Sequence, residues 1–484
     1  MAHTATPEGR GLQNTFQRPE HLFLLPIGGT ATAGLAGLLK LAGHHVEGAD
    51  AEIYPPMSTL LEDLAIPVRL GFSEEGPPRD VDRVIIGNAL PRSNPEVQAV
   101  LRRRLPFLSQ AEAVAHYLLS HGQHSLVVAG THGKTTTSAL LAWILESSGE
   151  DPSYLVGGLL QWSRRSFRLG RGRCFVIEGD EYNTAFFDRG PKFLHYRPHI
   201  FTLGPVEFDH GDIYRDLDAV LTAFRAGSAQ VPRDGAVVVS GWSPNAIAAV
   251  RDTAARVVVV GPDDGCTARV SEMASGPDGA SASVTWQGEL LRLQLPIPGR
   301  HNLHNAALAL ATALEAGVPA QPALAALALF PGVARRLELV GEHAGISVVD
   351  DFAHHPTALA ATISAARERW PDRRLVVAYE PRSLTACGAL FQDGYASALA
   401  AADLVLVAPP HHRRRLPPAE LLDRDRLARA LEGRGVRALM PGEAADPVAS
   451  LLPLLEPGDV VIGCSSGSFG DFHRRLLEGL GARS

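Results

Sequence analysis

The sequence predicts an α/β protein organised as three successive domains. Its 484 residues are enough for about three domains of ordinary size, at ~150 residues each. Short runs of Val, Ile and Leu recur along the chain, and many are followed by glycine or polar residues and then by a segment long enough for a helix. This alternation is typical of parallel sheets covered by helices. We expect the domains to span residues 20–122, 123–330 and 331–484.

The composition favours a soluble globular protein. The chain is 45% hydrophobic and 20% charged, with a net charge of −7, which argues against general nucleic-acid binding and gives no sign of a membrane surface. No apolar run approaches the ~20 residues of a membrane helix, and the first twenty residues lack the apolar core of a signal peptide. The four cysteines are far apart and form no CxxC pair. We therefore expect reduced cysteines and a cytoplasmic location.

A glycine-rich turn between a strand and a helix organises the central domain. Residues 126–129 are four apolar residues that predict a buried strand, and residues 130–133 form a turn bracketed by glycines. Lys134 and Thr135 follow, and an apolar helix begins there. Backbone N–H groups at such a turn can bind nucleotide phosphates, while the lysine reaches the outer phosphates and the threonine hydroxyl holds Mg²⁺. An ordinary strand-to-helix turn is the alternative.

Acidic residues follow the next two predicted strands. We expect the strand after the glycine-rich turn to be residues 174–177, which lead into Glu178-Gly-Asp-Glu181. A further strand, residues 199–203, leads to Glu207-Phe-Asp-His210. Because ligands of α/β sheets bind at the carboxyl ends of the strands, these side chains are candidate metal ligands beside the phosphates. A solvated acidic loop and a structural histidine are the alternatives.

The N-terminal domain begins with a possible pyrophosphate-binding unit. Residues 21–27 predict a strand, residues 28–34 a glycine-rich turn and residues 35–42 a helix. Asp50 follows a second strand, about twenty residues after the turn, as in Rossmann-like domains. The glycine spacing does not fit GxGxxG, so a purely structural βαβ unit is an equal alternative.

The rest of the chain repeats the same plan. Residues 213–225 predict an amphipathic helix, and Asn302 and Asn305 lie one turn apart at the start of an Ala- and Leu-rich helix. Their amides could contact a purine edge, although either could instead cap the helix. Polar residues or glycine follow each of the predicted strands of the last domain, which are residues 346–349, 374–379, 403–408 and 459–463.

Five motifs in one order carry a resemblance to a known family. They are Pro-Ile-Gly-Gly-Thr from Pro26, Gly-Thr-His-Gly-Lys-Thr-Thr from Gly130, Glu-Phe-Asp-His ending at His210, His-Asn-Leu-His-Asn from His301, and Asp-Asp-Phe-Ala-His-His-Pro from Asp350. In these motifs the chain resembles the Mur ligases over about residues 20–480. The resemblance implies a three-domain Mur ligase architecture: a Rossmann-like N-terminal domain that holds a UDP-sugar, a P-loop ATPase-like central domain that holds Mg-ATP, and a Rossmann-like C-terminal domain that brings the amine substrate.

The resemblance also implies roles for individual residues. The implied catalytic residues are Lys134, Glu178 and His210, and the implied Mg²⁺ ligands are Thr135, Glu178 and His210, with Glu181 as the alternative acid. The implied ATP-binding residues are Gly130, Thr131, His132, Gly133, Lys134, Thr135, Thr136, Asn302, Asn305, Arg335 (or its neighbour Arg336), Asp351 and His354. The implied substrate-binding residues are Gly28, Gly29, Thr30, Asp50, Asn88, Arg382 and Arg414.

Within the family, four segments favour one branch. They are residues 50–61, residues 86–89, residues 179–187 and Glu380-Pro-Arg-Ser383. These segments are similar to those of ligases that join UDP-N-acetylmuramate to L-alanyl-γ-D-glutamyl-meso-diaminopimelate through an acyl phosphate, in peptidoglycan recycling. The alternative is the ligase that adds L-alanine in peptidoglycan biosynthesis. A folylpolyglutamate-type ligase and a non-catalytic nucleotide-binding module are more distant alternatives. The resemblance implies no nucleic acid, membrane or obligate protein partner.

Overall fold

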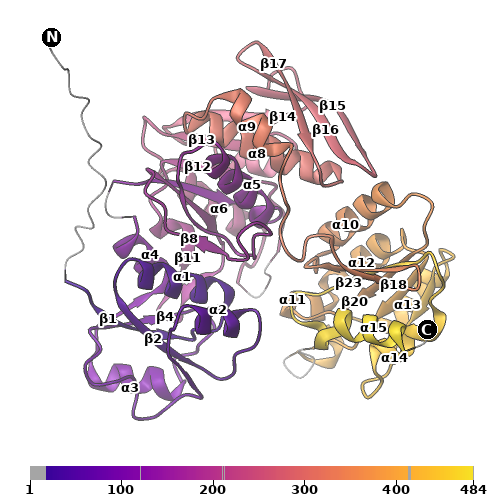
Figure 1. The fold of residues 1–484 in the computed structure, drawn as a ribbon, viewed down its shortest axis with the longest axis horizontal. Coiled ribbons are helices and arrows are strands. Elements are labelled where there is room, and N and C mark those ends of the chain that lie inside the picture. Colours follow the sequence, from indigo (N-terminus) through magenta and orange to yellow (C-terminus); the bar gives the residue numbers. More distant parts are fainter. Residues whose placement is uncertain (1–17, 120–121, 210, 212, 412–415, 483–484) are drawn as a thin grey trace, which may run out of the picture.

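The chain forms three α/β lobes, each built around its own sheet (Figure 1). The computed structural model describes residues 18–119, 122–209, 211, 213–411 and 416–482. Within these residues the main sheets have five, ten and six strands, and one further two-stranded ribbon lies in the central lobe. The predicted α/β class and three-lobed organisation are confirmed. No helix among the described residues is both long and apolar enough to cross a membrane.

The N-terminal sheet is entirely parallel, with strand order β3-β2-β1-β4-β5. Its strands are β1 (His21–Leu25), β2 (His45–Asp50), β3 (Val68–Leu70), β4 (Arg83–Ile86) and β5 (Phe107–Ser109). The helices of this lobe are α1 (Thr30–Leu41), α2 (Met57–Asp63), α3 (Pro95–Arg103) and α4 (Gln110–Tyr117). The order places β1 at the centre, so the glycine turn after β1 opens at the middle of the carboxyl edge.

Helix α1 begins earlier than the sequence predicted. The turn expected over residues 28–34 ends at Gly29, which is extended and caps the helix, and Thr30 is the first helical residue. Gly34 and Gly37 lie inside α1 because the helix packs closely on the central lobe. A Cβ on Gly37 would lie 2.2 Å from Cζ of Phe167, and one on Gly34 would lie 2.8 Å from Cδ1 of Leu155. These glycines serve packing, and the predicted turn was wrong in its extent.

The central sheet has the strand order β17-β16-β15-β14-β13-β12-β6-β9-β7-β8. Its middle strands β13, β12, β6, β9 and β7 are parallel. The strands are β6 (His124–Ala129), β7 (Ser153–Leu155), β8 (Phe167–Arg168), β9 (Cys174–Gly179), β12 (Ile200–Leu203), β13 (Ala236–Ser240), β14 (Arg256–Gly261), β15 (Ala268–Gly276), β16 (Gly279–Trp286) and β17 (Glu289–Leu295). The ribbon is β10 (Asn183–Ala185) with β11 (Asp188–Pro191).

Apolar cores cover both faces of the central sheet. Side chains such as Leu126 and Val176 join one buried cluster, and Val127 and Ile177, the alternate residues of the same strands, join another. This alternation explains why the strands read as continuous apolar runs, since both faces of a parallel sheet are buried. The helices of this lobe are α5 (Lys134–Ser147), α6 (Leu217–Ser228), α7 (Pro244–Ala249), α8 (Arg300–Glu315) and α9 (Ala320–Leu327).

Two predictions for the central lobe need correction. The strand that follows the glycine-rich turn is β7, not residues 174–177, because β7 and β8 precede β9 along the chain and form the sheet edge. The helix expected over residues 213–225 begins at Leu217, where the Asp216 side chain accepts a hydrogen bond of 2.9 Å from the Ala219 amide. This N-cap fixes the start of α6.

The C-terminal sheet has the order β18-β19-β23-β20-β21-β22, with only the edge strand β18 antiparallel. The strands are β18 (Glu338–His343), β19 (Ile346–Asp351), β20 (Leu375–Tyr379), β21 (Leu404–Val407), β22 (Arg437–Leu439) and β23 (Val460–Cys464). The main helices are α10 (Pro356–Arg369), α11 (Leu384–Cys387), α12 (Gln392–Leu399), α13 (Arg424–Glu432), α14 (Pro447–Leu451) and α15 (Phe472–Gly481). Helix α10 faces the central lobe (Figure 1).

The contact between α1 and β8 leads to a prediction. Replacing Gly37 with alanine forces the Phe167 ring to move. Overpacking of this kind costs about 1–3 kcal/mol or more, which exceeds the gain of about 1 kcal/mol in helix propensity. We expect Gly37→Ala to lower the midpoint of thermal unfolding by a few degrees, measured by calorimetry. Gly265→Ala is the control, because a Cβ at Gly265 meets nothing within 4 Å. Equal midpoints for the two variants would contradict the prediction.

Candidate active site

The glycine-rich turn between β6 and α5 requires glycine at both ends. Gly130 and Gly133 have φ angles of +127° and +79°, which L side chains rarely adopt. A Cβ on Gly130 would lie 3.1 Å from the backbone of Gly204, and one on Gly133 would lie 2.3 Å from Oδ1 of Asn305. The turn is therefore wedged between the loop after β12 and the first turns of α8. This contact also brings the predicted adenine ligand Asn305 directly against the turn, residues 130–133, which is called the phosphate loop below after its predicted role.

Lys134 closes back over the turn. Its Nζ donates to the Gly130 carbonyl at 2.8 Å and lies 2.9 Å from Oε2 of Glu181, and both charged side chains are at least 90% buried. Burial alone would lower the pKa of Lys134, but the carboxylates of Glu181 and Asp180 outweigh it and hold the pKa above its ordinary value. The amine is thus a permanent cation at the mouth of the turn.

Glu178 lies at the end of β9, beside the phosphate loop. Parallel pairing puts it opposite Val128 of β6. Its carboxylate accepts hydrogen bonds from the Thr135 hydroxyl at 3.2 Å and from the Gly157 amide at 2.5 Å. Burial, together with the nearby Asp180 charge, raises the pKa of Glu178 to about 7. The charges of Lys134 and Arg336 offset the cost of ionising this carboxylate only in part. Hydroxyl and carboxylate oxygens are the ligand types that Mg²⁺ prefers. The donor set therefore fits that ion.

Two predicted residues lie outside the described part of the chain. His210, the expected second metal ligand, follows Asp209 in the loop after β12, and Arg414 was expected to bind the peptide substrate. The roles predicted for both remain predictions. Glu181, the alternative metal ligand, is paired with Lys134 instead.

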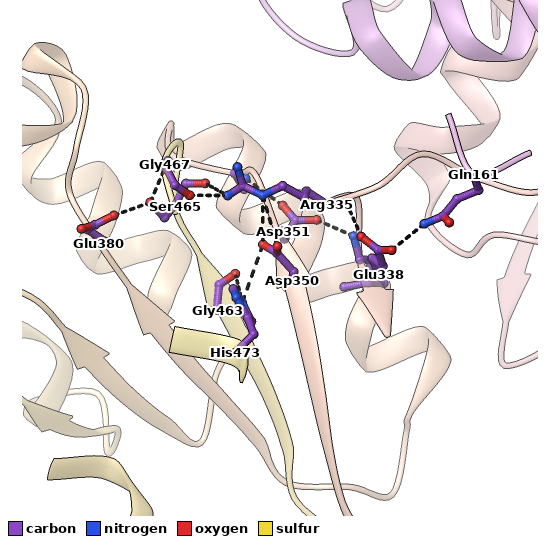
Figure 2. A network of polar contacts seen from close by, with 12 residues as sticks. Gln161, Arg335, Glu338, Asp350, Asp351, Glu380, Gly463, Ser465, Gly467 and His473 are labelled. Atoms are coloured by element: carbon purple, nitrogen blue, oxygen red, sulfur yellow. Dashed lines mark hydrogen bonds and ion pairs between the residues drawn. The ribbon is translucent and has the colours of Figure 1, made fainter. Parts of the chain in front are cut away.

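The C-terminal lobe contributes a polar network beside the strand ends of its sheet (Figure 2). The Arg335 guanidinium donates to the carbonyls of Ser465 and Gly467, both at 2.7 Å, and pairs with Asp350 at 3.1 Å. The guanidinium of Arg335 is thus held within its own lobe. The prediction that Arg335 binds nucleotide stays untested.

The neighbouring Arg336, unlike Arg335, interacts with charged groups of both lobes. Burial lowers its pKa, while the charges of Asp351 and Glu178 act in the other direction. Glu178 belongs to the central lobe and Asp351 to the C-terminal lobe. Arg336 is therefore a cation shared between the two lobes, close to the phosphate loop.

Asp351 and His354 shape the loop after β19. The buried Asp351 carboxylate accepts hydrogen bonds from the Leu337 amide at 2.7 Å, the Ala353 amide at 2.8 Å and the Thr362 hydroxyl at 3.0 Å. Burial is also the main cause that raises its pKa. The His354 carbonyl accepts hydrogen bonds from two tyrosine hydroxyls, at 3.0 and 2.9 Å. Asp351 thereby fixes the path of the loop, and the His354 side chain reaches the cleft described next.

A cleft of about 450 Å³ lies where the three lobes meet. The predicted residues Asn88 and His354 line it from the N-terminal and C-terminal lobes. The sequence analysis predicted no binding role for its other lining residues. Apart from Ile213, which begins the helix predicted over residues 213–225, they follow predicted strands. The other lining residues are Tyr182, Asn183, Ile213, Phe352, Ser383, Leu384, Thr385 and Ser466.

The N-terminal glycine turn is organised by Asp50. Oδ2 of Asp50 accepts a hydrogen bond of 2.7 Å from the Gly28 amide, and Oδ1 accepts one of 2.8 Å from the Ala51 amide. A Cβ on Gly28 would lie 2.8 Å from Oδ2 of Asp50. Gly29 and Thr30 begin α1 beside it. The acidic residue therefore orders the loop in this structure, and its predicted role in substrate binding stays a prediction.

Comparisons with known families identify the class of protein. Sequence models match residues 23–121 as "Mur ligase family, catalytic domain", residues 128–313 as "Mur ligase middle domain" and residues 335–467 as "Mur ligase, glutamate ligase domain". The chain belongs to the Mur ligase family and is therefore an ATP-dependent ligase.

Individual relatives narrow the branch of the family. The chain is 37% identical, over 96% of its length and 99% of the relative's, to UDP-N-acetylmuramate–L-alanyl-γ-D-glutamyl-meso-2,6-diaminoheptandioate ligase of Escherichia coli. It is similar to the crystal structure of a murein peptide ligase from Psychrobacter arcticus, with a TM-score of 0.75 and 31% identity over 96% of this chain and 99% of that one. The UDP-N-acetylmuramate–alanine ligase of Thermotoga maritima shares the fold, with a TM-score of 0.78 and 23% identity over 96% and 99% of the two chains.

The environment of Glu178 predicts an unusual pH dependence. An acid whose folded-state pKa is raised from 4.5 to about 7 gives up its proton more readily when unfolded, so its contribution to stability falls as the pH rises from about 4.5 to 7. One pKa unit corresponds to ~1.4 kcal/mol. Because Glu178 keeps some solvent access, we expect Glu178→Gln to raise the free energy of unfolding at pH 8 by only about 1–3 kcal/mol.

The measurement is urea unfolding at pH 5 and pH 8, without nucleotide or divalent cations. The gain should be small at pH 5 and larger at pH 8. Glu289→Gln, at an exposed position on β17, is the control and should show no pH-dependent gain. A destabilised Glu178→Gln variant at pH 8 would contradict the assignment of a buried, uncompensated carboxylate.

Proposed function

We propose that this chain joins the lactyl carboxylate of UDP-N-acetylmuramate to the amine of L-alanyl-γ-D-glutamyl-meso-diaminopimelate, with hydrolysis of ATP to ADP and phosphate, in peptidoglycan recycling. The observation that carries the proposal is the 37% identity to the E. coli ligase along nearly the whole of both chains. The cleft between three lobes supports it, because a nucleotide-sugar, ATP and a peptide must meet at one point.

The proposed ATP site is the turn between β6 and α5. The amides at the start of α5 face the phosphates, and Lys134 leaves Glu181 to contact the outer phosphates. Thr135 and Glu178, with His210 as predicted from the sequence, are the residues that would hold Mg²⁺. When bound, the ion supplies positive charge to the β- and γ-phosphates. Asn302 and Asn305 lie in the first turns of α8, and we expect them to contact the adenine of the nucleotide.

The proposed chemistry has two steps. A lactyl carboxylate oxygen attacks the γ-phosphorus, the bond to the β-phosphate oxygen breaks, and an acyl phosphate and ADP form. The neutral α-amine of the peptide then attacks the acyl carbon, phosphate leaves, and the amine loses a proton. Lys134 and Arg336 are the cations that the chain itself offers to the spreading phosphoryl charge. Because water would hydrolyse the acyl phosphate, we expect the lobes to close before the first step.

The proposed peptide site lies in the C-terminal lobe. The tripeptide carries several carboxylates, which require cations. Arg382 lies across Gly467, where a Cβ would meet its Nε at 2.2 Å, and Glu380 lies 3.7 Å from its Nη1. The next residues, Ser383 to Thr385, line the cleft. Arg382 is therefore the described arginine best placed to pair with a peptide carboxylate at the mouth of the cleft.

The first test compares acceptors. We expect UDP-N-acetylmuramate-dependent phosphate release with the tripeptide and none above background with L-alanine, measured by a coupled phosphate assay with ATP and Mg²⁺. Activity with L-alanine alone would move the chain to the alternative, biosynthetic branch of the family. Activity with neither acceptor would reject both amine substrates.

A second test addresses Arg382. Loss of one charge-assisted contact costs about 1.5–3 kcal/mol, so Arg382→Ala should raise the tripeptide KM roughly 10- to 100-fold and leave the KM for ATP within about twofold. Arg426→Ala, which removes an exposed ion pair with Asp393 in the same lobe, is the matched control. If the tripeptide KM is equal in both variants, Arg382 does not bind the peptide.

A further inference from the structure

Three side chains from separate segments meet at the junction of the central and C-terminal lobes. His132 belongs to the phosphate loop, Glu207 follows β12, and His355 caps the start of α10. One possible ligand atom from each lies within 4.8 Å of the other two. The predicted Mg²⁺ ligands do not include Glu207 or His355, so this His–Glu–His cluster is separate from the pair Thr135 and Glu178.

Direct contacts already join the cluster. Nε2 of His132 lies 3.1 Å from Oε2 of Glu207, and the same carboxylate oxygen accepts a hydrogen bond of 2.8 Å from the Thr357 hydroxyl of α10. The rings of His132 and His355 lie 4.8 Å apart, inclined by 39°. Glu207 thus bridges the phosphate loop and the C-terminal lobe.

His355 has an unused nitrogen. The residue is only 7% exposed. Its Nδ1 accepts a hydrogen bond of 3.3 Å from the Thr357 amide, whereas the buried Nε2 has no hydrogen-bond partner among the residues that the structure describes. A buried polar atom without a partner is costly and unusual in a native structure. A bound ligand at the cluster would remove that cost.

The protonation states suit a metal ligand. Burial, aided by the neighbouring His132, lowers the pKa of His355 to about 4. The hydrogen bond with His132 is the main cause that lowers the pKa of Glu207 to about 2. At neutral pH the cluster therefore offers a neutral imidazole and an ionised carboxylate, and metal binding needs these deprotonated forms.

We propose that His132, Glu207 and His355 bind a divalent transition-metal ion of the Zn²⁺ type. Two imidazoles and one carboxylate form a ligand set that Zn²⁺ uses widely, whereas Mg²⁺ prefers oxygen ligands alone. Metal–ligand distances of about 2.0–2.2 Å place tetrahedral ligand atoms about 3.4 Å apart. The pair His132 and Glu207 already meets this spacing, at 3.1 Å. His355 completes the site by a small movement of its ring. Binding through Nε2 places the ring proton on Nδ1, so the long 3.3 Å hydrogen bond from the Thr357 amide is given up. Water takes the fourth position.

The ion would connect two lobes that must move during turnover. Because its ligands come from both lobes, it binds only when they are in contact, and it shifts the population toward that arrangement. His132 is also part of the phosphate loop, so the ion restrains the loop itself. Bound Zn²⁺ therefore opposes the opening of the two lobes. This inference does not depend on which amine the enzyme accepts.

The test uses Co²⁺ as a spectroscopic probe of the full-length chain, without nucleotide or Mg²⁺. We expect one Co²⁺ per chain, visible d–d bands of a tetrahedral site, no sulfur charge-transfer band, and displacement by one equivalent of Zn²⁺. Glu207→Gln and His355→Asn should each weaken binding at least about tenfold, since the loss even of a supporting contact costs about 10–100-fold. Asparagine preserves a cap for α10.

The control is His45→Asn, which removes an exposed imidazole from β2 and should leave Co²⁺ affinity unchanged. Absence of Co²⁺ binding by the wild-type chain overturns the proposal. Equal Co²⁺ affinity in the wild type and in Glu207→Gln also overturns the proposal. Because Glu207→Gln is nearly isosteric, it keeps the test valid if His355→Asn does not fold. Co²⁺ binding that is lost in Glu178→Gln but kept in Glu207→Gln assigns the ion to the nucleotide site and likewise overturns it.

Discussion

The parallel alignment of β9, β6 and β12 is the constraint on which the candidate site depends. Ala129, the last residue of β6, pairs with Gly179 on one side and Leu203 on the other. The three strands therefore end at the same level, and the loops that follow them meet. One of these loops is the phosphate loop, another follows Glu178 and Gly179 at the end of β9, and the third contains Glu207. A shift of one residue in either pairing would turn these side chains to the opposite face of the sheet.

The carboxyl edge of this sheet also concentrates charge in a poorly solvated place. Lys134 and Glu181 neutralise each other there, while Glu178 has no equally close cation and keeps its proton near neutral pH. In the proposed nucleotide complex both arrangements would change, since the phosphates would compete with Glu181 for Lys134 and the cation would stabilise the Glu178 anion. Under that proposal, each ligand would replace an interaction that the protein makes without ligands.

The strands and the phosphate loop could be predicted from the sequence because their signals are local. Four apolar residues followed by a glycine-bracketed turn and Lys134 need no knowledge of the rest of the chain. Errors arose where distant contacts decide the local structure. Gly34 resembles a turn residue, but it lies in a helix that packs on Leu155. The strand β7 has only three residues, too few for a periodic pattern.

The two neighbouring arginines show that prediction of the candidate site from sequence has the same limit. Arg335 and Arg336 are indistinguishable in sequence, yet one is held by carbonyls of its own lobe and the other faces Glu178 of the central lobe. The positive φ angle at Arg335 turns the backbone so that the two arginine side chains point in different directions. The cluster around Glu207 could not have been predicted either, because its members are far apart in the chain and meet only through the packing of two lobes.

The connection between the central and C-terminal lobes has a mechanical consequence. The Ala334 amide donates to the Leu159 carbonyl of the central lobe at 2.9 Å, and the very next residue, Arg335, is fixed to the C-terminal lobe (Figure 2). Beside this point, the Gln161 side chain donates a hydrogen bond of 2.7 Å to the Glu338 carboxylate. The chain is thus anchored on both sides of a single peptide unit. This peptide unit can act as a hinge for the C-terminal lobe. A rotation of a few degrees there would displace the far end of the lobe by several times the movement at the phosphate loop.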